Sequence, residues 1–168
     1  EIGHLRWELA SLLALAYVYQ EIGDYRRGKE TCALALELAE GVGSPHWNRI
    51  LASQIATGCA TLGTTEEARE AIACAGVTDT LDDPGTMDSV AKRQVWAARA
   101  DIAIAEGDPA RAIAIIDQLG ATSGGGAASY PDPVLEIPLI ALRRSRAYRA
   151  LGDLAAAERD ARAAHAVA

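Results

Sequence analysis

Hydrophobic residues recur along the chain at intervals of three and four, and short polar turns interrupt this pattern at regular distances. The period is that of amphipathic helices. The pattern predicts helices over 2–22, 25–40, 46–62, 65–75, 87–106, 109–119, 133–151 and 154–167. Taken in pairs, these helices form repeats over about 2–41, 45–76, 87–120 and 132–167 of what we expect to be a single domain.

A glycine-containing turn separates the two helices of each expected pair. The glycines are spaced 40, 44 and 45 residues apart, and they are Gly23, Gly63, Gly107 and Gly152. Glycine ends a helix in the left-handed conformation without steric cost. The residue that follows is Asp or Thr, whose side chain can cap the next helix, and Thr64 with Glu67 has the spacing of a capping box. Each turn is therefore predicted to end one helix and start another.

Small residues stand at two fixed distances from these glycines. Seven residues before them lie Ala16, Ala56, Ala100 and Ser145, and five residues after them lie Gly28, Ala68, Ala112 and Ala157. Small side chains at both positions let two helices approach closely, so close packing is expected within each pair.

This pattern resembles the tetratricopeptide repeat, with its small–small contact, its Gly-Asp turn and its following segment, here Ala35-Leu36-Glu37-Leu38. The resemblance covers essentially the whole chain and implies an all-α, right-handed superhelical solenoid of about four antiparallel helix pairs. Two features depart from the family. The period is longer than its usual value of about 34 residues, with the extra length in links near 76–86 and 121–131, and Gly28 replaces the usual Ala.

Composition supports helices and excludes several functions. Half of the 168 residues are hydrophobic, mainly Ala and Leu, while aromatic residues make up 5% and Phe is absent. The net charge of −7 argues against binding to nucleic-acid phosphates, with a local exception at Arg143, Arg144, Arg146 and Arg149.

No apolar run reaches the roughly 18 residues of a membrane span, and no signal peptide is recognisable, so we expect a cytoplasmic protein without membrane contact. Because the chain begins with Glu1, we expect a piece of a longer protein.

No catalytic or metal-binding motif is recognisable. The three cysteines lack paired spacing, so we expect them to be buried, reduced thiols. The three histidines lack neighbours at metal-ligand spacing and are expected at the surface. Trp96 is expected in the core, Trp47 beneath the preceding helix pair, and Trp7 in packing or an interface. Pro138 is expected to bend the seventh helix. We predict a protein that is not an enzyme and has no cofactor or metal.

The resemblance implies a binding face along the first helix of each pair. Its lining would be Leu13, Tyr17, Gln20, Glu21, Ser53, Thr57, Thr61, Gln94, Ala97, Asp101, Leu142, Arg146 and Arg149. Of these, Tyr17, Gln20, Thr57, Asp101, Arg146 and Arg149 are the predicted binding residues, with Asp101 as a lone acid. Arg146 and Arg149 lie one turn apart and could clamp a peptide carboxylate. In the alternative, both are solvated or paired with carboxylates of neighbouring helices.

Two functions follow from this pattern. The first is a scaffold that binds a peptide or partner protein on its concave face. The alternative is the sensory segment of a larger bacterial transcriptional regulator that binds a small-molecule effector, because the alanine-rich repeats and the segment 143–154 are similar to the C-terminal helical arrays of ATPase-containing activators. The last helix runs through alanines to Ala168 without a polar cap, so we also expect homodimerisation through a terminal helix pair.

Overall fold

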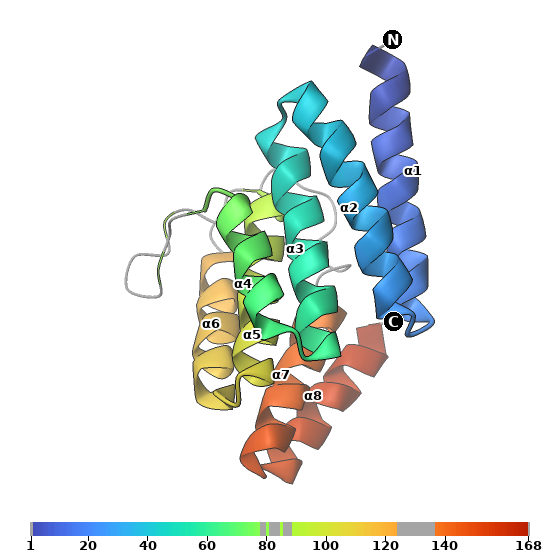
Figure 1. Cartoon of the computed structure of the whole chain (residues 1–168). Coiled ribbons are helices and arrows are strands. Elements are labelled where there is room, and N and C mark those ends of the chain that lie inside the picture. The colour runs from blue at the N-terminus through green and yellow to red at the C-terminus, as the bar shows by residue number, and fades with distance from the viewer. Residues whose placement is uncertain (1, 78–79, 81–84, 86–88, 124–136, 168) are drawn as a thin grey trace.

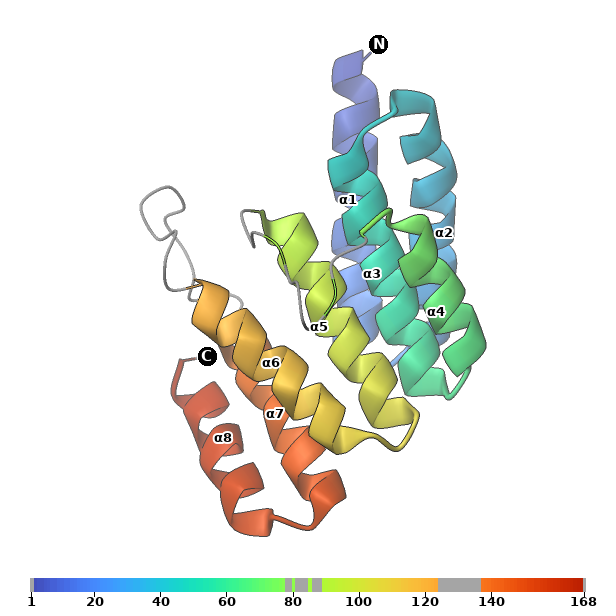
Figure 2. The same ribbon diagram turned by 90° about the vertical axis from the view of Figure 1, so that its left-hand side faces the viewer.

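The computed structural model describes residues 2–77, 80, 85, 89–123 and 137–167, and all regular structure in these residues is helical (Figure 1). The helices are α1 (Ile2–Glu21), α2 (Tyr25–Val42), α3 (Pro45–Leu62), α4 (Thr65–Cys74), α5 (Val90–Ala105), α6 (Pro109–Ser123), α7 (Ile137–Leu151) and α8 (Leu154–Val167). They form four hairpin pairs, which follow one another from α1 and α2 at one end to α7 and α8 at the other (Figure 2). The predicted all-α class and the four helix pairs are confirmed.

The turns within the pairs have the expected chemistry. Gly23 adopts a φ of +80°, and the amide of Asp24 donates to the carbonyl of Tyr19 over 2.8 Å, which closes the end of α1. The carboxylate of Asp24 then accepts from the amide of Arg27 at the start of α2. The same left-handed glycine recurs in the other pairs, and the same aspartate cap recurs at Asp108 and Asp153.

The capping box predicted at Thr64 and Glu67 is wrong. The Thr64 hydroxyl donates back to the carbonyl of Cys59 over 3.3 Å and does not cap α4. Glu67 instead accepts from Lys29 Nζ, 2.8 Å away on α2. A cationic partner on a neighbouring helix thus takes the carboxylate that the local motif would have used.

The core consists of three overlapping layers, each built from one helix pair and the first helix of the next. The first layer joins α1, α2 and α3 around Leu9 and Leu51. The second joins α3, α4 and α5, and the third joins α5, α6 and α7 around Trp96, which is 1% exposed as expected. Each layer shares a helix with the next, as in other stacked repeats.

Small residues allow the close approach that the repeats predicted. Ala16, Ala56 and Ala100 are fully buried. Gly28 is buried as well, and a Cβ at this position would lie 3.3 Å from the carbonyl oxygen of Ala16. The departure from the family's alanine at position 28 is therefore explained by the tight contact between α1 and α2.

Two helix ends differ from the prediction by three residues or more. α5 begins at Val90, because the side chain of Ser89 accepts from the amide of Lys92 and caps the helix there. α6 continues four residues beyond its predicted end, to Ser123. The described part of α7 begins at Ile137, one residue before Pro138, so the bend expected at Pro138 stays a prediction. The predicted helix start at 133, like most of both long links, lies outside the described residues.

Candidate binding face

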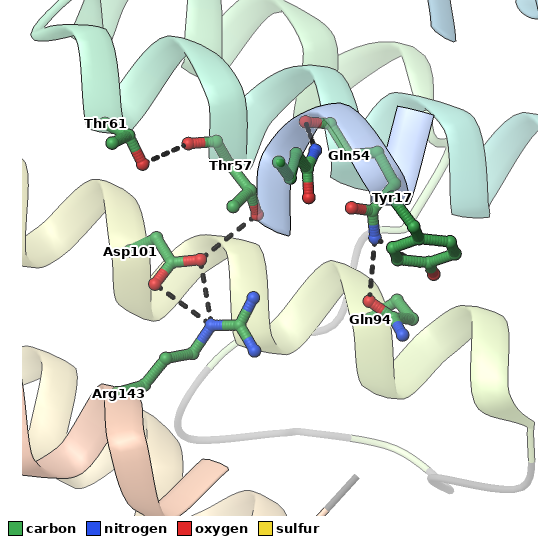
Figure 3. Close-up of polar contacts among 8 residues, drawn as sticks. Tyr17, Gln54, Thr57, Thr61, Gln94, Asp101 and Arg143 are labelled. Carbon is green, nitrogen blue, oxygen red and sulfur yellow. Dashed lines mark hydrogen bonds and ion pairs between the residues drawn. The ribbon is translucent and has the colours of Figure 1, made fainter. Parts of the chain in front are cut away.

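The first helices of the four pairs bring most of the predicted binding residues together on one side of the array, which we call the inner face. It is the side of α1, α3, α5 and α7 that carries the polar contacts drawn in Figure 3. Those contacts form two groups, one around Gln54 and one around Asp101.

Gln54 of α3 joins α1 to α5. Its amide nitrogen donates to the Tyr17 hydroxyl over 3.3 Å and to Gln94 Oε1 over 3.0 Å. Gln20 donates to the backbone carbonyl of Gln54 over 3.4 Å. Because Gln54 is only 3% exposed, these partners satisfy an amide that would otherwise be costly to bury. Tyr17 and Gln20, both predicted binding residues, therefore help to hold α1 against α3.

Asp101 of α5 joins α3 to α7. It accepts from the Thr57 hydroxyl over 3.1 Å, and Arg143 Nε lies 3.0 Å from one carboxylate oxygen and 2.9 Å from the other (Figure 3). Asp101 is 8% exposed and the Arg143 side chain is 13% exposed. The interpretation of Asp101 as a lone acid is therefore wrong, because Arg143 neutralises it and removes it from solvent.

The contacts follow the repeat positions with a shift of one helical turn. Tyr17, Thr57, Asp101 and Arg146 each lie six residues before the turn glycine. Thr57 and Asp101 meet as equivalent residues. Tyr17, however, meets Gln54, and Asp101 meets Arg143, which lie three residues before the equivalent position. The roles of Gln54 and Arg143 were not predicted from sequence. Alignment of the repeats identifies equivalent positions, but it does not show that facing helices are offset by three residues.

The arginines of α7 divide into two kinds. Arg143 and Arg144 are paired, the latter with Asp160 over 2.6 Å and with Asp117 over 3.2 Å. The hydrogen bonds that Arg144 donates to the Asp160 carboxylate raise the pKa of the Arg144 guanidinium.

Arg146 and Arg149 are exposed, and neither makes an ion pair with another described residue. Within the alternative to a ligand clamp, solvation fits these two side chains, and pairing with the described carboxylates of neighbouring helices does not. Whether they bind a ligand stays a prediction.

The described residues offer little for other chemistry. They contain no group of three or more His, Cys, Asp and Glu side chains that could hold a metal, and none of their helices is long and apolar enough to cross a membrane. Burial raises the pKa of the Cys32 thiol to about 12, and Cys59 is buried too. Cys74 is exposed, so the prediction that all three thiols are buried is wrong. It is the last residue of α4 and lies between Ile72 and Ala75, both of which belong to the second core layer.

Comparisons with known proteins agree with this architecture. A tetratricopeptide repeat model matches residues 9–41, which span most of the α1–α2 pair. No curated protein is significantly similar in sequence. Among solved structures, the fold is similar to that of BtubC (BKLC) from P. vanneervenii, with a TM-score of 0.59 and 19% identity over 95% of this chain and 62% of that one.

Identity this low shows the fold alone, and the chain spans less than two thirds of the length of BtubC. The chain thus carries a tetratricopeptide repeat in its first helix pair and has the fold of a helical-repeat protein throughout its described pairs. The likeness to bacterial transcriptional regulators stays a prediction.

Proposed function

We propose that this chain is a protein-interaction scaffold whose inner face binds an acidic peptide segment of a partner at Arg146 and Arg149. Tetratricopeptide repeats generally mediate protein–protein interaction, and the first helix pair is such a repeat. The choice of segment chemistry rests on the exposed end of α7.

The observation that carries the proposal is a strip of three exposed residues on α7. Leu142, Arg146 and Arg149 follow one another at intervals of four and three residues, so they share one side of the helix. Guanidinium groups match carboxylates through two parallel hydrogen bonds. The strip therefore offers two cationic groups beside an apolar one, which suits a peptide with acidic and aliphatic residues.

The neighbouring ion pairs keep this strip available. The nearby carboxylates Asp101 and Asp160 are already bound by Arg143 and Arg144. These two ion pairs also hold α7 between α5 and α8. The helix that carries the strip therefore has its position set before a ligand binds. A rigid site loses less conformational entropy on binding.

Binding is tested by fluorescence anisotropy with a labelled decapeptide of Glu and Leu that ends in a free carboxylate. The same peptide with Lys in place of Glu is the ligand control. We expect Arg146→Ala with Arg149→Ala to weaken binding at least about tenfold, since one charge-assisted hydrogen bond contributes about 1.5–3 kcal/mol.

The matched control variant is Arg159→Ala with Arg162→Ala, which removes two exposed arginines from α8 instead. It should bind the acidic peptide as the unmodified chain does. Equal loss in both double variants would show a nonspecific charge effect, and equal binding by the Lys peptide would refute the assigned chemistry.

A further inference from the structure

The side of α1 that faces away from α2 and α3 carries large apolar residues in solvent. Trp7 is 77% exposed, Leu15 42%, Val18 55% and Ile22, just past the helix end, 69%. Together with the exposed small residues Ser11 and Ala14 they form one continuous side of the helix, which we call the outer stripe.

The outer stripe makes α1 apolar on two opposite sides. Its other side buries Leu9 and Ala16 completely in the core. Helices that are apolar all round normally lie between other elements. In Figure 1, however, α1 stands at the margin of the array beside α2. A contiguous exposed apolar surface of this kind marks an interaction site.

The opposite edge of the array does not complement this stripe. The outward side of α8 carries the exposed ion pair of Glu158 and Arg162, together with Arg159. The alanines of α8 do not form a continuous outward surface, because Ala156, Ala157 and Ala164 are buried against the rest of the array. A head-to-tail contact of α1 with α8 would press these charges against apolar side chains, which is unfavourable.

The outer stripe does complement itself. Read from either end, its positions 7, 11, 14, 15, 18 and 22 have the same spacing. An antiparallel copy therefore places Trp7 opposite Ile22, the small Ser11 opposite Val18, and the small Ala14 opposite Leu15. In the last two pairs a large side chain meets a small one, which favours close packing.

We propose that the chain forms a two-fold symmetric homodimer in which the outer stripes of two α1 helices pack antiparallel. Such an interface uses the same surface twice and closes at two copies. Trp7 and Ile22 are separated by about 22 Å along the helix. One helix face of this length buries less than the ~800 Å² per partner of a standard interface, so the dimer dissociates at micromolar concentrations.

Mass measured by sedimentation equilibrium tests the association. From about 5 to 500 μM, a range that brackets a weak interface, the mass should rise from 17.6 kDa toward twice that value. Leu15→Glu with Val18→Glu should remain monomeric throughout. The control, Leu34→Glu with Leu154→Glu, adds the same charge at exposed leucines of α2 and α8 and should associate as the unmodified chain does. Circular dichroism checks that both variants are folded.

Cysteine cross-linking tests the orientation, in a Cys74→Ser background that removes the exposed thiol. Leu15→Cys lies beside the two-fold axis and should link to its own copy. Ile22→Cys should not link to itself, but a mixture of Trp7→Cys and Ile22→Cys chains should form the mixed disulfide.

Three results would overturn this dimer. The first is a mass of 17.6 kDa at every concentration. The second is efficient linkage of Ile22→Cys to itself, which requires parallel helices. The third is dissociation by the Leu34 and Leu154 control. Because none of these depends on Arg146 or Arg149, failure here leaves the proposed peptide site untouched.

Discussion

Breaking the ion pair between Asp101 and Arg143 by removing one partner should destabilise this array more than most single substitutions do. Both side chains are largely removed from water, and three polar contacts of 2.9–3.1 Å converge on the carboxylate. Asp101→Ala leaves the guanidinium of Arg143 buried without its partner. Breaking a buried pair in this way costs about 3–5 kcal/mol. We expect the lower end, about 3 kcal/mol, because the Arg143 side chain keeps 13% exposure.

The loss is measured by urea unfolding, followed by circular dichroism and by tryptophan fluorescence. Trp96 lies in the layer shared by α5, α6 and α7 and reports on this part of the core. Coincident transitions would justify a two-state free energy of unfolding. For a chain of this length, about 3 kcal/mol corresponds to a melting temperature lower by about 6–12 °C. Glu158→Ala, which breaks an exposed pair, should cost less than about 1 kcal/mol.

A double variant separates the pair from simple loss of packing. Asp101→Leu with Arg143→Met replaces both charges by apolar groups of similar size, and it should recover most of the lost stability. A cost below about 1 kcal/mol for Asp101→Ala would refute the inference of a buried pair. So would a double variant whose cost equals the sum of the single ones.

Three further predictions concern other parts of the chain. Gly120→Ala should stabilise the protein by up to about 1 kcal/mol because position 120 is helical and open, whereas Gly152→Ala should destabilise it by a similar amount because φ is +82°; thermal melts decide both signs. The hydrogen bond from Lys29 lowers the pKa of Glu67 below its ordinary 4.5, so the pair's stabilisation is present above pH 4.5 and is lost as the pH falls through the lower, folded-state pKa. NMR titration of the carboxyl should show a midpoint below 4.5, and Lys29→Met should return it to the ordinary value. A thiol reagent at pH 8 should modify Cys74 rapidly in the native protein, and the two buried cysteines only after unfolding; rapid modification of more than one thiol would contradict the burial.

The turns were predictable from sequence because their chemistry is local. A left-handed glycine followed by an aspartate defines a helix end and a helix start within five residues, and three of the four caps form as expected. The Thr64 hydroxyl fails as a cap because it donates back to the carbonyl of Cys59, and the other half of the expected capping box fails for a reason outside this window. The carboxylate of Glu67 is bound by Lys29, 38 residues away in sequence, and no local motif contains that competitor.

The candidate site was predictable only to within a helical turn. Thr57 and Asp101 occupy equivalent repeat positions, and the two side chains meet. The repeat spacing gives no information about the crossing between α5 and α7, which brings Arg143 rather than Arg146 to the carboxylate. The four arginines of α7 look alike in sequence, and only the carboxylates on α5, α6 and α8 distinguish the paired ones from the exposed ones.

The proposed peptide site lies on α7, and the outer stripe lies on the side of α1 opposite the inner face, so one can be filled without blocking the other. Tyr17 and Leu15 are two positions apart, as are Gln20 and Ile22, and two positions on a helix correspond to nearly opposite directions. A dimer formed through the outer stripe therefore leaves both inner faces open and presents two peptide sites. A ligand with two linked acidic segments should then bind the dimer more tightly than a single segment does. Leu15→Glu with Val18→Glu should abolish that gain without changing affinity for the single segment, whereas a change in single-segment affinity would show that the two surfaces are not independent.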